Sequence, residues 1–199
     1  MTTPIIIKNA TTTDEASIID ILVRAFNMDP AVRWIWSDSQ QYYKHSPSFV
    51  KAFGGKAFTH GTAYYVDGYI GAALWLPPDV QPDEDMMMSV LQHTVREHIQ
   101  KDAFAVFDQM SRYHPSEPHW YLPIMGVDPS RHGRGFGSAL LQHTLISAIE
   151  RISLHILNLQ VRRISPSTND TALSYLALFR LGHHLLSFQC SANLSEVVI

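Results

Sequence analysis

The segment IMGVDPSRHGRGFGSALL (residues 124–141) places Gly133, Gly135 and Gly137 between an apolar run and an amphipathic stretch. The chain has only 10 glycines in 199 residues, so this concentration needs a local reason. Glycine adopts positive φ without strain and lets a ligand approach the backbone closely. The first N–H groups of a helix lack partners within the helix, and its dipole attracts anions. The segment therefore predicts a strand, a turn and a helix that together bind a phosphate-like anion.

Two better-known phosphate-binding patterns do not fit this turn. A P-loop ends in Gly-Lys-Ser/Thr, whereas Gly137 is followed directly by Ser138. The dinucleotide fingerprint needs G-x-G-x-x-G in an opening βαβ unit, and the spacing here is G-x-G-x-G, late in the chain. Arg131 and Arg134 in the same turn add charge-assisted contacts to a phosphate. The pattern thus favours a phosphate carried by another kind of ligand.

Hydrophobic periodicity elsewhere predicts a mixed sheet with helices on both faces. The expected strands are 4–10, a hairpin over 61–78 that turns at Asp67-Gly68, 119–127, 154–161 and one or two in the last stretch. The expected helices are 11–27, about 40–53, one or two within 79–115, 135–152 and about 170–181, with an irregular aromatic segment at 29–40. Since no repeat or long linker interrupts this order, we predict one domain, 1–199, with a helical insertion at about 80–115.

Composition excludes several classes of function. An apolar fraction of 46% is enough to bury a full core, and the net charge of −3 without charge runs argues against a nucleic-acid partner. No secretory signal and no stretch of 18 apolar residues is present, so we expect a soluble cytoplasmic protein with no membrane contact. The single cysteine, Cys190, and the irregular spacing of 11 histidines argue against a metal site.

The segment VDPSRHGRGFGSALL (127–141) resembles the acetyl-CoA-binding motif of the GNAT N-acetyltransferase superfamily, Arg/Gln-x-x-Gly-x-Gly/Ala after a Val-x-Pro strand end. The matching positions are Val127, Pro129, Gly135, Gly137, Leu140 and Leu141, while His132 stands where the family has Arg or Gln. The resemblance implies an α/β (α+β) GNAT fold. In that fold a central, mixed, mostly antiparallel β-sheet is splayed at the acetyl-CoA site and carries helices on both faces.

The resemblance also implies which residues bind acetyl-CoA (coenzyme A) as a co-substrate, with no metal. Main-chain groups of Met125 and Val127 are expected to pair with the pantetheine arm, and amides from His132 to Ser138 with the phosphates. The implied cofactor residues are Met125, Gly126, Val127, His132, Gly133, Arg134, Gly135, Phe136, Gly137, Ser138 and Asn169.

Direct transfer needs a neutral amine, and a lysine-type amine has a pKa of about 10.4, so a general base is required. The candidates are His119, because an imidazole needs little pKa tuning to accept a proton near pH 7, and Glu117, which lies between Pro115 and Pro118. By resemblance, Tyr175 in the expected helix is the proton donor to the departing thiolate, one residue early in the family pattern. Solvated side chains for the first two and core packing for Tyr175 remain alternatives.

The sequence indicates the acceptor-binding residues less clearly than the cofactor-binding residues. By resemblance, the segment DPAVRWIWSD borders the acceptor, with Trp34 and Trp36 as substrate-binding residues, although packing between helices explains them equally well. The run Met86–Met88 and the aromatic residues Phe104, Phe107 and Tyr113 fit a helical lid, a homodimer face or core packing.

Together these features predict an acetyl-CoA-dependent N-acetyltransferase, an acyltransferase that acts on a primary amine of a small molecule or peptide by direct attack. One alternative is transfer of a longer acyl group, which needs a wider tunnel near Trp75 and Trp120. The other is a non-catalytic CoA-binding sensor or regulatory protein, which binds the cofactor without turnover.

Overall fold

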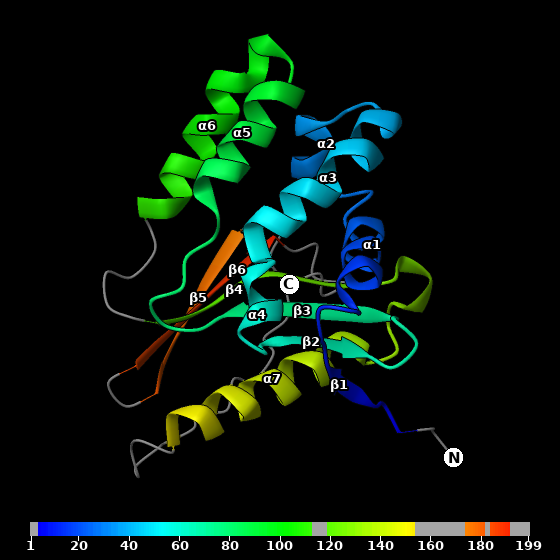
Figure 1. The fold of residues 1–199 in the computed structure, drawn as a ribbon, viewed down its shortest axis with the longest axis vertical. Coiled ribbons are helices and arrows are strands. Elements are labelled where there is room, and N and C mark those ends of the chain that lie inside the picture. Colours follow the sequence, from blue (N-terminus) through cyan, green and yellow to red (C-terminus); the bar gives the residue numbers. More distant parts are fainter. Residues whose placement is uncertain (1–3, 113–118, 154–173, 182–183, 192–199) are drawn as a thin grey trace.

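A computed structural model describes residues 4–112, 119–153, 174–181 and 184–191 (Figure 1). The strands are β1 (Ile7–Asn9), β2 (Ala63–Val66), β3 (Gly71–Leu76), β4 (His119–Val127), β5 (Ser174–Leu181) and β6 (His184–Ser191). The helices are α1 (Glu15–Ala25), α2 (Pro30–Ile35), α3 (Ser39–Gly54), α4 (Lys56–Thr59), α5 (Glu84–Thr94), α6 (Glu97–Arg112) and α7 (Phe136–Ser153), with a 3₁₀ turn η1 (Pro129–Arg131).

The strands form one 6-stranded sheet in the order β1-β2-β3-β4-β6-β5. Neighbouring strands are antiparallel except for β4 and β6, which run parallel. The mixed, mostly antiparallel sheet expected from the sequence is therefore confirmed. The hairpin of β2 and β3 turns at Asp67-Gly68 as predicted, and Gly68 has the positive φ of 80° that this turn needs.

Side chains alternate along each strand, so the two faces of the sheet pack in two separate cores. One core contains Tyr65, Leu74 and Tyr121 together with residues from α1, α3 and α5. The other contains Tyr64, Trp75 and residues of α7. Among the described helices, Figure 1 shows α7 on one side of the sheet and α1, α3, α5 and α6 on the other. Helices thus cover both faces.

A bulge in β4 separates its two halves. Leu74 pairs with Ile124 but Leu76 pairs with Tyr121, so β4 has one more residue than β3 in this interval. The extra residue lies at Leu122–Pro123, and a proline, which has no N–H group, is tolerated at such an interruption of the ladder. Pairing of β4 with β6 extends only from His119 to Leu122, although both strands continue. The sheet is therefore splayed from Pro123 onward.

Two expectations for local structure are wrong. Residues 30–35, predicted to be irregular, form α2, because Asp29 accepts a hydrogen bond from the Val32 N–H at 2.9 Å and Pro30 occupies the first turn. The helix predicted at about 170–181 is instead strand β5 over Ser174–Leu181, which pairs with β6 along its whole length. Short apolar runs suit either structure, and strand pairing decides here. The strand predicted at 154–161 lies outside the described residues.

Candidate functional site

The glycine turn begins with a capped 3₁₀ turn after β4. The Asp128 carboxylate accepts hydrogen bonds from the N–H of Ser130 at 2.9 Å and from its hydroxyl at 2.7 Å. These bonds, aided by the nearby Arg24 and Arg131, lower the pKa of Asp128 below its usual value. Asp128 is therefore an ionised structural cap that fixes the direction of the chain as it leaves the sheet.

Two of the three glycines have backbone conformations that other residues avoid. Gly133 and Gly135 have φ angles of 72° and 82°, in the left-handed region. A Cβ on Gly133 would meet nothing within 4 Å, and one on Gly135 only the Ile5 methyl at 4.0 Å. The glycines are therefore required by backbone conformation and not by crowding, and the space beside the turn is open.

Consecutive N–H groups point out of this turn without an acceptor. The first hydrogen bond of α7 runs from the Ala139 N–H to the Gly135 carbonyl at 2.9 Å. Within the part of the chain that the structure describes, no acceptor contacts the N–H groups of Gly133 to Ser138. Unpaired donors at a helix N-terminus, with the helix dipole behind them, are suited to an anion such as a phosphate.

The second half of β4 presents its main chain on the open side of the splay. The Asp128 N–H donates to the Ile70 carbonyl at 2.8 Å, which fixes the alternation of the β3–β4 ladder. By that alternation Ile124 and Gly126 bond to β3, whereas the N–H and C=O groups of Met125 and Val127 point toward the side that β6 has left. No described strand pairs with β4 there.

His132 contacts this open edge with its side chain. Its Nε2 donates a hydrogen bond to the Val127 carbonyl at 3.0 Å, which assigns the proton to that nitrogen. The imidazole thus links the glycine turn to the end of β4. The side chains of Arg131 and Arg134 are exposed beside the turn and form no ion pair with any described residue.

The turn is anchored to both cores. Phe136 and Leu140 of α7 pack in the core that contains Met125 and Val127. On the other face Gly126 lies against α1 so closely that a Cβ would come within 2.7 Å of the Ala25 Cβ. Any side chain at this position would therefore push α1 away from β4.

The structure describes some of the predicted catalytic residues but not all of them. His119 is the first residue of β4, is 7% exposed, and shares the face of Tyr121 by strand alternation. Tyr175 lies on β5 and not on a helix, aligned with Cys190, two residues beyond the last β6 residue that pairs with β4. Glu117 and the cofactor candidate Asn169 lie outside the described residues. The catalytic roles stay predictions.

The two tryptophans proposed for the acceptor side differ in environment. Trp36 is 3% exposed, and its indole N–H donates to the Thr94 hydroxyl at 3.0 Å, which ties the end of α2 to α5. Trp34 is 40% exposed on α2. The structure thus gives Trp36 a place in the core, and substrate binding by either residue stays a prediction.

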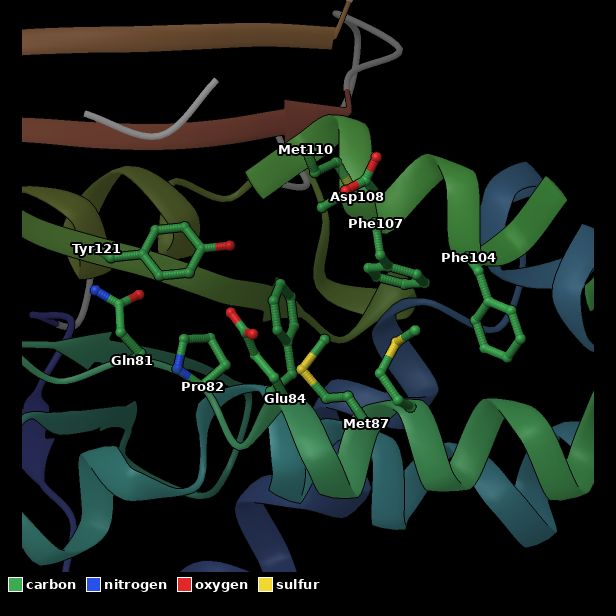
Figure 2. Close-up of a pocket in the computed structure, with 11 residues that line it drawn as sticks. Gln81, Pro82, Glu84, Met87, Phe104, Phe107, Asp108, Met110 and Tyr121 are labelled. Carbon is green, nitrogen blue, oxygen red and sulfur yellow. The ribbon is translucent and has the colours of Figure 1, made fainter. Parts of the chain in front are cut away.

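A pocket that the sequence did not indicate lies on the face of the sheet covered by α1, α3, α5 and α6, between β4, α3, α5 and α6 (Figure 2). Its volume is about 380 Å³. The lining residues are Phe53, Gln81, Pro82, Glu84, Met87, Met88, Phe104, Phe107, Asp108, Met110 and Tyr121. Sequence analysis singled out Met86–Met88, Phe104 and Phe107 as a group but missed Glu84, Asp108 and Tyr121, because only the fold brings β4 beneath α5 and α6.

The described residues contain neither a metal-binding cluster nor a membrane-spanning helix. No three His, Cys, Asp or Glu side chains in those ranges lie close enough together to hold a metal ion. None of the described helices combines the length and the hydropathy needed to cross a bilayer.

Comparison with known proteins agrees with this geometry. The sequence profile of the acetyltransferase (GNAT) family matches residues 19–173, which include the bulged strand and the glycine turn. No curated protein sequence matches the chain.

Several solved structures resemble this one. A Corynebacterium glutamicum structure, described as histone acetyltransferase HPA2 and related acetyltransferase, is 26% identical with a TM-score of 0.50, over 73% of this chain and 72% of that chain. Arylalkylamine N-acetyltransferase 2 from Aedes aegypti is 13% identical with a TM-score of 0.51, over 75% of this chain and 72% of that one. The second likeness concerns the fold alone.

Proposed function

The chain belongs to the GNAT acetyltransferase family, and from this premise we propose that it transfers the acetyl group of acetyl-CoA to a primary amine. The family itself implies an acyltransferase that uses acetyl-CoA. The finer statement, direct attack by an amine of a small molecule or peptide, is our proposal.

One observation supports the proposal most strongly: two sets of main-chain groups that have no partner among the described residues adjoin each other. The donors of Gly133 to Ser138 suit a diphosphate, and the outward N–H and C=O groups of Met125 and the N–H of Val127 suit the amides of a pantetheine arm, while the Val127 carbonyl accepts from His132. From Val127 to Leu122 the strand spans about 16 Å at about 3.3 Å per residue. A ligand bound along this edge reaches from the turn to the bulge at Pro123.

Acetyl-CoA supplies a thioester at the far end of this edge, and the protein has to position an amine and remove its proton. We assign the proton acceptor to His119, because it lies on the pocket face of β4 and an imidazole titrates near neutral pH. Glu117 is the other candidate base. Tyr175 is assigned as the proton donor to the thiolate, since its backbone aligns with the part of β6 that has separated from β4.

A short acyl group is favoured over a long one. Trp75 and Trp120, beside which a longer chain would have to pass, are 1% and 5% exposed in the core under α7. Comparing acetyl-, butyryl- and octanoyl-CoA as donors tests this point, and the expected rate falls with chain length. Equal or faster transfer of the octanoyl group contradicts the assignment.

Calorimetry with acetyl-CoA, followed by a thioester-consumption assay over a panel of amines, tests the proposal as a whole. We expect binding in the micromolar range and turnover on at least one primary amine. Absence of binding contradicts the cofactor assignment. Binding without turnover on any amine indicates the sensor instead of the enzyme.

The catalytic assignment has its own test. Replacing His119 with Gln and Tyr175 with Phe is expected to lower kcat by about 10²-fold or more for each residue that transfers a proton. The His119→Gln profile is also expected to lose the lower limb of the wild-type pH dependence. A loss below about threefold for both variants removes the acid–base assignment and leaves acetyl-CoA binding intact.

A further inference from the structure

We propose that the pocket between β4, α3, α5 and α6 binds the acceptor, and that the acceptor is a small cationic amine carried on an apolar, ring-sized body. This inference rests on the proposed function and adds the substrate class to it. Four observations carry it: the size of the pocket, its apolar lining, the sign of its charges and its place beside the splay.

The size and lining suit an apolar body. A volume of about 380 Å³ lies at the small end of the range of small-molecule sites. Three phenylalanines and three methionines provide most of the wall, namely Phe53, Phe104, Phe107, Met87, Met88 and Met110. Methionine side chains adapt to irregular shapes and make favourable contacts with aromatic rings. Figure 2 shows Phe104, Phe107 and Met87 gathered on one side of the pocket.

The charged lining is acidic. Glu84, in the first turn of α5, and Asp108, on α6, both line the pocket. No lysine, arginine or histidine is among the described residues that line it. Asp108 is paired with Arg112 at 2.7 Å, so Glu84 is the carboxylate that we assign to the ammonium. An anionic acceptor would meet only like charge there, whereas an amine meets a complementary one.

The pocket reaches the sheet where the strands separate. Tyr121 lines it and lies two residues before Pro123, next to the last β4 residue that pairs with β6. Its ring packs edge-on against Phe53 of α3, with centroids 6.2 Å apart. In Figure 2 the Tyr121 hydroxyl points into the space between the surrounding side chains. Burial raises the pKa of this phenol, so it stays protonated and is a polar group at the sheet end of the pocket.

A matched set of ligands tests the substrate class. 2-Phenylethylamine has both the ring and the ammonium, ethanolamine lacks the ring, and 3-phenylpropanoate carries a carboxylate in place of the ammonium. With acetyl-CoA present, we expect kcat/KM for 2-phenylethylamine to exceed that for ethanolamine by about tenfold or more, because a ring is buried. We expect 3-phenylpropanoate not to compete. Equal kcat/KM for the two amines, or competition by the acid, overturns the inference.

Matched variants test the location. Met88 lines the pocket and is 39% exposed, whereas its neighbour Met86 is 51% exposed and does not line it. Met88→Trp is expected to raise KM for 2-phenylethylamine by about fivefold or more by filling the pocket, and Met86→Trp to leave it unchanged. Glu84→Gln is expected to raise KM by about two- to fivefold, and Asp85→Asn, which removes a charge from the same turn, to have no such effect. Identical behaviour within each pair overturns the inference.

Failure of this inference differs from failure of the proposed function. Amine acetylation with no response to Met88→Trp or Glu84→Gln removes the pocket and keeps the acetyltransferase. Absence of acetyl-CoA binding removes the acetyltransferase. In that event, calorimetric binding of 2-phenylethylamine that is lost in Met88→Trp still supports the pocket.

Discussion

The two halves of the candidate site differ in the chemical groups that they present. The cofactor half, from Met125 to Ser138, presents main-chain N–H and C=O groups, and its conformation depends on glycines with positive φ. The acceptor half, between β4 and α3, α5 and α6, presents side chains of phenylalanine, methionine and two acids. On the proposed assignment, we expect the first half to tolerate most substitutions that preserve the backbone. We expect amine specificity to depend on the side chains of the second half.

The largest effect is expected from a glycine of the cofactor half. Gly135→Val places a β-branched residue at a φ of 82°, which remodels the turn and misdirects its amides. We expect acetyl-CoA affinity to fall by about 100-fold, measured by calorimetry, since several charge-assisted hydrogen bonds depend on this geometry.

Gly68 provides the matched control, because it has a φ of 80° in the β2–β3 turn and open space around it. Gly68→Val introduces comparable backbone strain and is expected to lower thermal stability without changing acetyl-CoA affinity. An equal loss of affinity in the two variants would mean that Gly135 acts through stability alone, and the comparison of the two halves would fail.

A buried side chain on the acceptor side gives the next largest effect. Trp36→Phe removes the hydrogen bond to Thr94 and leaves a smaller ring in the core, at a cost of about 1–2 kcal/mol in the free energy of unfolding. Because Thr94 ends α5, we expect KM for the amine to rise while acetyl-CoA affinity is unchanged. Trp34→Phe, at an exposed site, is the control and is expected to cost less than about 0.5 kcal/mol. Larger destabilisation by Trp34→Phe would reverse the structural assignment of the two residues.

Asp128 caps the 3₁₀ turn that leads into the glycine turn, and its contribution to stability is expected to vary with pH. Asp128→Ala is expected to lower the free energy of unfolding by about 1 kcal/mol at pH 7, because the cap of η1 is lost. The folded-state pKa of Asp128 lies below its unfolded value, so this stabilisation is present above the unfolded pKa of about 4. It is lost as pH falls through the folded-state pKa.

Denaturant unfolding of the wild type and Asp128→Ala between pH 7 and pH 3 therefore checks the cap. The difference between the two proteins is expected to shrink below about pH 4. Asp128→Asn keeps a capping oxygen and is expected to lose less than Asp128→Ala. A difference that grows toward low pH contradicts the assignment.

The smallest effect is expected at His132, whose side chain contacts a main-chain carbonyl of the cofactor half. His132→Ala leaves the turn amides in place, so acetyl-CoA affinity is expected to change by less than about threefold in calorimetry at neutral pH. A loss near that of Gly135→Val would show that the cofactor half also depends on side chains. Such a result would break the distinction between the two halves.

The difference between a site built from main-chain groups and one built from side chains also explains which features could be predicted from the sequence. The strand, turn and helix around Gly133–Gly137 were predictable because backbone constraints appear directly in residue type, and β4, η1 and α7 confirm them. The β2–β3 hairpin was predictable for the same reason, from Asp67-Gly68. The pocket was not, because Glu84, Asp108 and Tyr121 are far apart in sequence and meet only when α5 and α6 fold over β4.

The two wrong predictions of local structure have simpler physical causes. Asp29-Pro30 is a helix-start signal, because a capping acid precedes a first-turn proline. The aromatic residues that follow led to the prediction of an irregular segment instead. Residues 174–181 have an apolar pattern compatible with either structure, and only pairing with β6 distinguishes a strand from a helix there.

The bulge at Pro123 also has a consequence for how copies of the protein meet. A straight strand with free main-chain groups is a template onto which another chain can add, and such edges promote aggregation. The edge of β4 that no described strand pairs with starts at a bulge and a residue without a donor, so an incoming straight strand would lose its register within the first few residues. The opening in which we propose that a narrow ligand binds is therefore a poor site for strand addition by a second polypeptide.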